Sequence, residues 1–318
     1  MEYEALERDG LILVERIGSL AAGVTAISRE VGRGNLVALR RGAYVRQSAW
    51  HIATPRERHV LRVRAAVAAA QRPVLAAGYS AAAVWGMPIA GAWPDEVLLL
   101  DKREGGGHIE PGVRRTSIGV STAVPAQVDG IPVTTLTRTA LDIALRSPFV
   151  DAVGSVDWAL WRKNPYAVTV DDLSRELELF ANTRGFRRIA HAANFASSLS
   201  DSFGESEARA VIHLLGFTAP EQQVEFRDDQ GLIEPDFYWR GIRTAVEFDG
   251  KVKYTRNEFT HGDPGEVAWR EKKREDRLRR MDVSVYRILT EDVKRPQRLE
   301  RVLLEAGVPR LHRTRGRS

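Results

Sequence analysis

Residues 233–254 read IEPDFYWRGIRTAVEFDGKVKY, and we interpret the rest of the chain outward from them. Valine, phenylalanine, tyrosine and tryptophan recur as they do in strands, and Arg240-Gly241-Ile242 predicts the turn of a β-hairpin. Side chains alternate between the two faces of a strand, so Glu247, Asp249 and Lys251 share one face. The apolar residues between them then face a core.

Antiparallel pairing of the two strands places Asp236 beside Glu247. Two adjacent carboxylates that have no counter-charge of their own repel each other unless a cation lies between them. A hard divalent ion with oxygen ligands, Mg²⁺ or Mn²⁺, is the natural occupant. Lys251 or Lys253 would then orient an attacking water or stabilise charge on a scissile phosphate.

The composition is typical of a chain that buries ordinary cores, with 43% hydrophobic and 28% charged residues. The length of 318 residues predicts two or three domains. The sequence has no run of about 18 apolar residues, so we expect no membrane span. The acidic start MEYEALERDG lacks a signal-peptide pattern. Cysteine is absent, which excludes disulfides and thiolate zinc sites. We therefore expect a cytoplasmic protein.

The net charge of +5 is unevenly placed along the chain. Lysine and arginine gather in RRGAYVR, TPRERHVLRVR, REKKREDRLRR and the final PRLHRTRGRS. Together such clusters predict a polyanionic partner, DNA above all, although each one alone is more typical of a solvated helix face.

Residues 1–52 predict a winged helix-turn-helix. LVERIGSL (13–20) has a helical pattern, Gly23 is expected to break it, and VTAISREV (24–31) predicts a second helix. NLVALRRGAYV then predicts two short strands that form a wing. In that fold the second helix reads bases and the wing contacts phosphates, so the candidate DNA-binding residues are Arg29, Arg40, Arg41 and Arg46. The alternative is a small helical cap without a DNA role.

Residues 53–200 predict a mixed α/β domain, and residues 201–306 predict a second one. The first begins with a helix whose capping box is Thr54 with Glu57. The second has the predicted order α-β-β-β-α-β-α, and either Ser202 or Gly204 can start its first helix. Residues 307–318 form a basic tail. The expected fold class is therefore a multidomain α/β protein.

The C-terminal motifs resemble the PD-(D/E)XK nuclease superfamily, in the branch related to very-short-patch-repair endonucleases. The carriers of the resemblance are PDF, EFDGKVKY, the helix WREKKREDRLRR and the strand VSVYRIL. The resemblance implies a three-layer α/β/α restriction-endonuclease-like domain and a divalent metal. It implies that Asp236 and Glu247 are the metal pair, that Glu205 on the first helix assists, and that Asp249 is the second acid of the E-x-D stretch. Gln223 is a weaker match.

One position departs from that resemblance, because Asp249 stands where the superfamily has a lysine. The role of that lysine is expected to pass to Lys251, Lys253 or Lys272, or to be lost. Glu207 is a rival to Glu205. The helix that follows the hairpin supplies further candidate nucleic-acid-binding residues: Lys272, Arg274 and Arg277.

The N-terminal half resembles the AbiEi-type antitoxins of abortive-infection systems. RRGAYV, AGYSAAAVWGMP and GIPVTTLTRTALDIA carry this resemblance, which spans roughly residues 10–165. It implies a winged helix-turn-helix before a mixed α/β domain, and a protein that represses transcription of its own operon.

Two functions are expected of the whole chain. The first is a metal-dependent DNA endonuclease of repair or phage defence. The alternative is a non-catalytic repressor in a type IV toxin-antitoxin-like system that binds a toxin gene operator. Double-strand cleavage would need a dimer or two passes.

Overall fold

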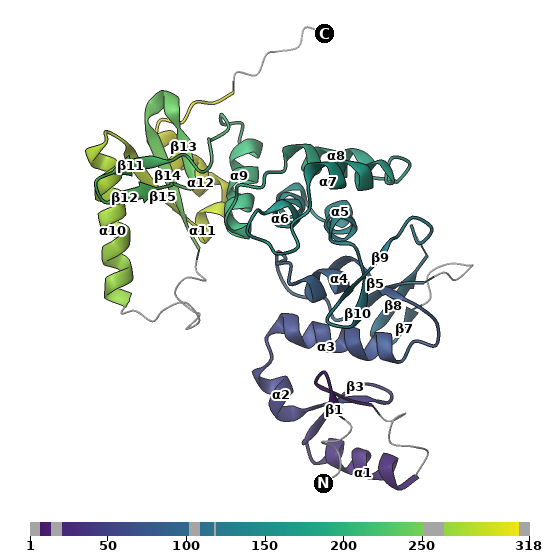
Figure 1. The fold of residues 1–318 in the computed structure, drawn as a ribbon. Coiled ribbons are helices and arrows are strands. Elements are labelled where there is room, and N and C mark those ends of the chain that lie inside the picture. The colour runs from purple at the N-terminus through teal and green to yellow at the C-terminus, as the bar shows by residue number, and fades with distance from the viewer. Residues whose placement is uncertain (1–6, 14–20, 102–108, 118, 251–263, 312–318) are drawn as a thin grey trace. The chain divides into compact units, whose positions relative to one another are not determined.

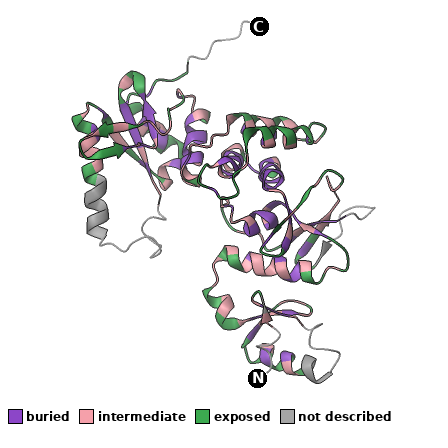
Figure 2. Ribbon diagram, viewed as in Figure 1, coloured by how far each residue is buried: buried purple, intermediate pink, exposed green. Residues whose placement is uncertain are grey.

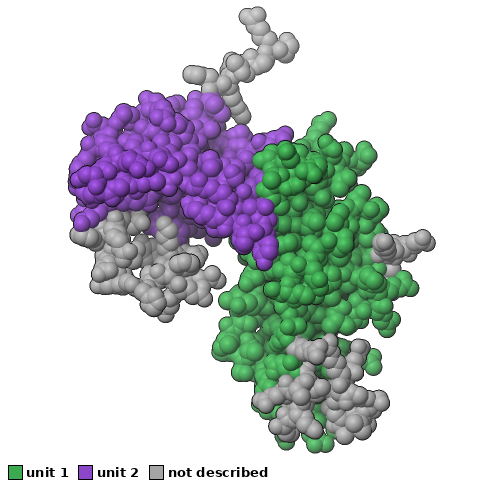
Figure 3. Space-filling model, viewed as in Figure 1, with its two compact units in different colours: residues 1–146, 168–190 green, residues 147–167, 191–318 purple. Residues whose placement is uncertain are grey.

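The computed structural model describes residues 7–13, 21–101, 109–117, 119–250 and 264–311 of a mixed α/β chain (Figure 1). The chain divides into two compact units, one of residues 1–146 and 168–190 and one of residues 147–167 and 191–318 (Figure 3). The second unit therefore takes in a segment that precedes the expected boundary at residue 200. In the described ranges, no helix is both long and apolar enough to cross a membrane.

The first unit opens with an antiparallel sheet in the order β1-β2-β4-β3. The elements are β1 (Glu7–Arg8), β2 (Leu11–Leu13), α1 (Ala21–Gly32), β3 (Leu36–Arg40), β4 (Ala43–Arg46) and α2 (Gln47–Ile52). The predicted hairpin after α1 is confirmed. The predicted helix over residues 13–20 is wrong at its start, because Leu13 ends β2, and residues 14–20 lie outside the described residues. Gly23 lies inside α1 and does not break it.

Strand β2 escaped prediction because both of its faces are covered. Leu11 packs with Ala43 on one side, together with Ala65 of the later helix α3 (Pro55–Ala68). Ile12 packs on the other side against Ile27 of α1 and Leu36. A strand that is buried on both faces loses its polar alternation, so its short apolar run is easily read as part of a helix.

A six-stranded mixed sheet in the order β7-β8-β6-β5-β10-β9 forms the main core of the first unit. Its strands are β5 (Leu75–Ala76), β6 (Val97–Leu100), β7 (Ile109–Glu110), β8 (Val113–Thr116), β9 (Pro125–Val128) and β10 (Ile131–Thr134). The helices are α3 (Pro55–Ala68), α4 (Gly78–Trp85), α5 (Leu136–Arg146) and α7 (Val170–Glu178). The Thr54–Glu57 capping box at the start of α3 is confirmed. Figure 2 shows how thoroughly α4 and α5 are buried.

The second unit is built on a three-stranded sheet in the order β13-β14-β15. The strands β13 (Phe237–Trp239) and β14 (Thr244–Asp249) are antiparallel and joined by a 3-10 turn, Arg240–Ile242, so the opening hairpin is confirmed. β15 (Ser284–Leu289) runs parallel to β14. The other elements are α6 (Phe149–Leu160), α8 (Phe186–Phe195, shared with the first unit), α9 (Phe203–Leu214), β11 (Phe226–Asp228), β12 (Gly231–Ile233), α10 (Pro264–Arg280), α11 (Thr290–Val293) and α12 (Pro296–Glu305).

Helices cover both faces of this sheet. Val246 and Phe248 belong to a core shared with α9 and α12, as the alternation of the hairpin predicted. Tyr238 and Ala245 belong to a second core that includes Leu278 of α10. By the alternation of strand residues, the acidic side chains of β14 lie on the α10 side, with Ala245.

Candidate functional site

The hairpin brings Asp236 to the strand that carries Glu247. Phe237 pairs with Val246, so Asp236 and Glu247 are the next facing positions of the two strands. Asp236 lies just before β13, and its Oδ2 accepts a hydrogen bond of 2.7 Å from the backbone N–H of Phe248. The carboxylate is thereby held against β14 at the end of the paired region.

Glu205 is fixed at the start of α9 by its own helix cap. Ser202 is the N-cap, and its hydroxyl accepts from the Glu205 N–H at 3.2 Å while it donates to Glu205 Oε1 at 2.8 Å. Glu205 Oε2 accepts from the Asp201 N–H at 2.8 Å. This reciprocal arrangement is what a Ser-x-x-Glu sequence predicts, and it leaves the side chain buried, at 7% exposure.

Burial and the nearby Asp236 carboxylate raise the pKa of Glu205 to about 7. Asp236 acts on it by charge repulsion. The start of α9 also lies against the hairpin, since Gly204 packs on the Phe248 ring of β14. Glu207 also has its pKa raised to about 7, by burial and by Asp151 of α6. The structure therefore brings Glu205, and not its rival Glu207, to Asp236.

Glu247 and Asp249 each face an arginine from another element. Arg274 Nη2 of α10 lies 3.3 Å from Glu247 Oε1. Arg287 Nη1 of β15 lies 3.6 Å from Asp249 Oδ2. The expectation that the Asp236–Glu247 pair has no counter-charge is therefore wrong for Glu247, because α10 supplies one from later in the chain.

Three predicted residues of the acidic site remain: Lys251, Lys253 and Gln223. Lys251 and Lys253 lie outside the described residues. Gln223 has a left-handed backbone, with φ of 54°, belongs to no strand, and accepts from Arg162 Nη2 at 2.5 Å. Over the described part of the chain, no three Asp, Glu or His side chains converge into a group that could hold a metal ion.

The predicted DNA-binding arginines of the first unit differ in their surroundings. Arg29, in the last turn of α1, and Arg41, in the β3–β4 turn, are exposed. Arg40 is half-buried. Arg46 Nε donates to Glu7 Oε2 at 2.7 Å, so part of its charge is matched within the sheet.

The predicted phosphate-binding residues on α10 also differ. Lys272 is exposed. Arg277 instead forms a fork on Asp228, with Nε 2.7 Å from Oδ2, and donates to the Gly231 carbonyl at 2.8 Å. Its hydrogen bonds lower the pKa of Asp228. Arg277 therefore ties α10 to the β11–β12 hairpin and does not stand free for a phosphate.

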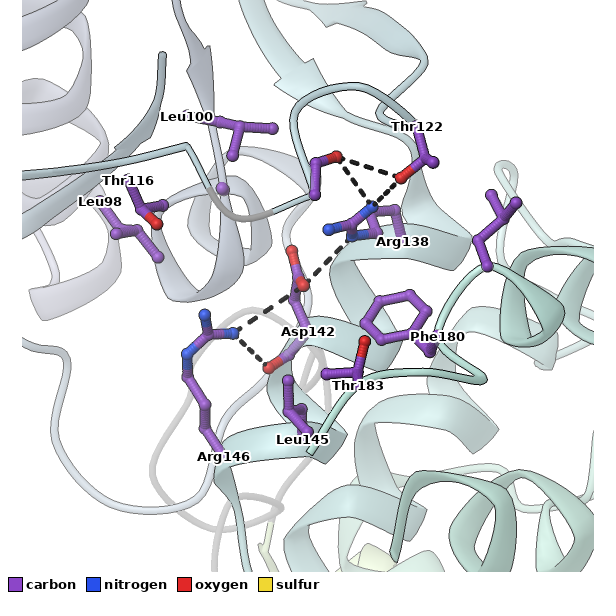
Figure 4. Close-up of a pocket in the computed structure, with 13 residues that line it drawn as sticks. Leu98, Leu100, Thr116, Thr122, Arg138, Asp142, Leu145, Arg146, Phe180 and Thr183 are labelled. Atoms are coloured by element: carbon purple, nitrogen blue, oxygen red, sulfur yellow. Dashed lines mark hydrogen bonds and ion pairs between the residues drawn. The ribbon is translucent and has the colours of Figure 1, made fainter. Parts of the chain in front are cut away.

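A second polar cluster surrounds a cavity of about 70 Å³ in the first unit (Figure 4). Arg138 Nε donates to Asp142 Oδ1 at 3.2 Å, its guanidinium lies 4.7 Å from the centre of the Phe180 ring, and its Nη1 lies 3.8 Å from Glu176. Burial raises the pKa of Asp142 against the opposing effect of Arg138. The cavity has room for a few waters only, so we interpret the cluster as packing between α5 and α7.

Arg287 was missed by the sequence predictions, although a signal was present. It is the one charged residue in the strand sequence SVYRIL. The parallel register sets it opposite Glu247 and two positions before the partner of Asp249. A lone arginine in an otherwise uncharged strand beside an acidic strand indicates a paired charge.

Comparison with known proteins gives no assignment. No family model matches the chain, and no curated protein matches it. Among solved structures, the chain is similar to the RV2827C protein from Mycobacterium tuberculosis. The two are 17% identical, the match covers 71% of this chain and 87% of the other, and the TM-score is 0.38. A similarity of this extent carries no argument about function.

Proposed function

We propose that the chain is a divalent-metal-dependent DNA endonuclease with a DNA-binding N-terminal module. The observation that carries the proposal is the pair of Glu205 and Asp236, two carboxylates on different elements that repel each other. A like-charge pair of one buried and one half-buried carboxylate is costly without a cation, and perturbed carboxylates of this kind concentrate at functional sites.

The finer fold belongs to the same proposal. We take residues 201–306 as a three-layer restriction-endonuclease-like domain, since α9 and α12 cover one face of its sheet and α10 the other. We take residues 1–52 as a winged helix-turn-helix, in which α1 precedes the β3–β4 wing. Residues 53–200 are the AbiEi-like α/β domain.

The described carboxylates suit a hard cation with oxygen ligands. Asp236 and Glu247, at facing positions of the hairpin, would bind Mg²⁺ or Mn²⁺, and Glu205 would move in as a third ligand when the metal binds. Glu247 would exchange Arg274 for the metal. Such an ion, when bound, polarises the phosphodiester and activates water. Asp249 would assist by holding the Arg287 guanidinium of the neighbouring strand β15 in place. Exposed Arg29 would contact bases, and exposed Arg41 and Lys272 would contact the DNA backbone.

The test is cleavage of supercoiled plasmid and single-stranded DNA with Mg²⁺, Mn²⁺ or EDTA. Asp236→Asn removes the charge but keeps an acceptor for the Phe248 N–H, so we expect it to fold and to lose cleavage by about 100-fold or more. Asp229→Asn, at an exposed residue of the β11–β12 turn, is the matched control and should cleave normally. Equal cleavage by both variants, or by the native protein in EDTA, would contradict the proposal.

A non-catalytic DNA-binding repressor or antitoxin is the second candidate. It is favoured by the arginines on Glu247 and Asp249, which match the hairpin charges without a metal. The same preparations separate the two functions. A repressor would bind its operator without cutting any DNA, and Arg41→Ala would weaken that binding, whereas Arg184→Ala, exposed on the turn before α8, would not.

A further inference from the structure

Arg274 is anchored at two points beside the acidic hairpin. It precedes the fully buried Leu278 by one helical turn, so both residues lie on the sheet-facing side of α10. Its Nη2 lies 3.3 Å from Glu247 Oε1 and donates to the backbone carbonyl of Glu234. The side chain is 30% exposed, so it is largely withdrawn from water but still reachable from it.

Arg287 is placed differently, although it faces the same strand. It lies between two carboxylates, 3.6 Å from Asp249 and 3.9 Å from Glu275. Its charge is therefore already shared by two acids. Arg274, in contrast, contacts the Glu247 carboxylate and the neutral carbonyl of Glu234. A metal ion bound to Glu247 would replace Arg274 as the partner of that carboxylate. The guanidinium of Arg274 could then contact another anion.

Strand β14, Thr244–Asp249, contributes no cation of its own, because Asp249 stands at the position where the resemblance expects a lysine. We propose that Arg274, from helix α10, supplies the positive charge that contacts the scissile phosphate. This inference rests on the proposed function and names a catalytic residue within it.

The chemistry of a guanidinium limits what Arg274 does. A guanidinium carries no acceptor and stays protonated in proteins, so Arg274 does not accept the proton of the attacking water and acts only as a fixed charge and hydrogen-bond donor. In the hydrolysis, the water oxygen forms a bond to phosphorus and gives up a proton to solvent. The bond from phosphorus to the sugar oxygen breaks, and that oxygen keeps the electron pair and takes up a proton. Negative charge grows on the non-bridging oxygens, where Arg274 would donate.

The experiment compares Arg274→Gln, Arg274→Lys and Arg279→Gln in the full chain. Glutamine keeps a donor for the Glu234 carbonyl but not the charge, and lysine keeps the charge. Arg279 is the control, because it lies on the same helix and its partners, Glu275 and Asp276, are on that helix too. Plasmid cleavage with Mn²⁺, Mn²⁺ binding by calorimetry without DNA, and thermal melting are measured for each.

We expect Arg274→Gln to lower kcat by about 100-fold or more while it binds Mn²⁺ at least as tightly as the native protein. Arg274→Lys should have a kcat at least about tenfold above that of Arg274→Gln, and the kcat of Arg279→Gln should stay within about twofold of the native value. Native cleavage by a folded Arg274→Gln overturns the inference alone, as does a matching loss of Mn²⁺ binding. If Arg274→Gln does not fold, a folded Arg274→Lys with no recovered activity overturns it. Absence of cleavage by the native protein overturns the proposed function and the inference together.

Discussion

Glu205 and Glu207 stand two positions apart on α9 and have separate neighbours. Two positions on a helix turn the side chain by about 200°, so only one of them faces the hairpin. Glu205 is held by Ser202 and repelled by Asp236, whereas Glu207 meets Asp151. The sequence was sufficient to prefer Glu205 over Glu207 as the site residue, since Glu205 completes the Ser202 cap. The sequence was not sufficient to predict that Glu205 lies near Asp236, because that depends on how α9 packs on β14.

His59 is a titratable residue whose environment is set by packing alone. It is fully buried, and its Nε2 lies 3.1 Å from the Ser80 hydroxyl. That hydroxyl accepts from the Leu98 N–H at 2.9 Å, so its own proton is available to donate to the neutral imidazole. Burial lowers the pKa of His59 to about 4. The pair is enclosed in the first unit and serves its stability.

We predict that His59 makes the first unit less stable as the pH falls from 6.5 to 4. The unfolded imidazole takes up a proton near pH 6.5, but the native one does so only near pH 4, so stability is complete above pH 6.5 and is lost below it. The difference amounts to about 3 kcal/mol at most. Urea unfolding at pH 7, 5.5 and 4.5 checks this, with His59→Gln as comparison. The variant should lose less stability across that range, and an identical pH slope would refute the prediction.

At the scale of elements, two glycines allow α9 to lie close to its neighbours. A Cβ on Gly204 would lie 2.4 Å from the Phe248 ring of β14, and a Cβ on Gly154 of α6 would lie 2.5 Å from the Phe203 ring. Real side chains do not approach so closely, so either methyl group would push rings and helices apart. These contacts are what bring Glu205 to the hairpin.

Gly204→Ala should therefore destabilise the second unit and weaken the proposed site. We expect a loss of about 1–3 kcal/mol, because the clash outweighs the better helix propensity of alanine. Gly241→Ala is the control, since a Cβ at that position would meet no atom within 4 Å and its φ is not positive. Denaturant unfolding and Mn²⁺ binding are measured for both. Equal stability of the two variants would show that α9 does not need this close approach.

At the scale of the whole molecule, residues 147–167 belong to the same unit as the candidate site. Asp157 of α6 and Arg209 of α9 form a buried ion pair, with Arg209 Nη2 at 3.0 and 2.8 Å from the two carboxylate oxygens. Asp157 also accepts from the Ser197 N–H at 2.7 Å. A buried pair that loses one partner leaves an uncompensated charge, which costs about 3–5 kcal/mol.

We predict that a fragment of residues 147–318 folds cooperatively and that a fragment of residues 201–318 does not. The shorter fragment lacks Asp157, so Arg209 has no buried partner, and it exposes the face of α9 that packs on α6. Circular dichroism melts and gel filtration of the two fragments check this. A shorter fragment that melts as sharply and at the same temperature as the longer one would mean that α6 is dispensable for the unit.

Local patterns determined several parts of this protein. The capping residues Thr54 and Ser202, and the alternation of Val246 and Phe248 with acidic residues, involve partners only a few positions apart. Such interactions are set by the periods of helix and strand, so the sequence is sufficient to predict them. The helix that follows Ser202 was accordingly predicted, and the opening hairpin was predicted with the correct faces.

Tertiary packing decided the rest. The pairing of Glu247 with Arg274, and of Asp249 with Arg287, joins side chains that are far apart in the chain. No local period reports where α10 or β15 will lie, and the same holds for β2, whose polar alternation disappears once both of its faces are covered. The sequence by itself determined which residues on the hairpin are acidic and which way they face. Only the tertiary structure decided which charges meet them, because the packing of helices on a sheet depends on the shape of the whole core.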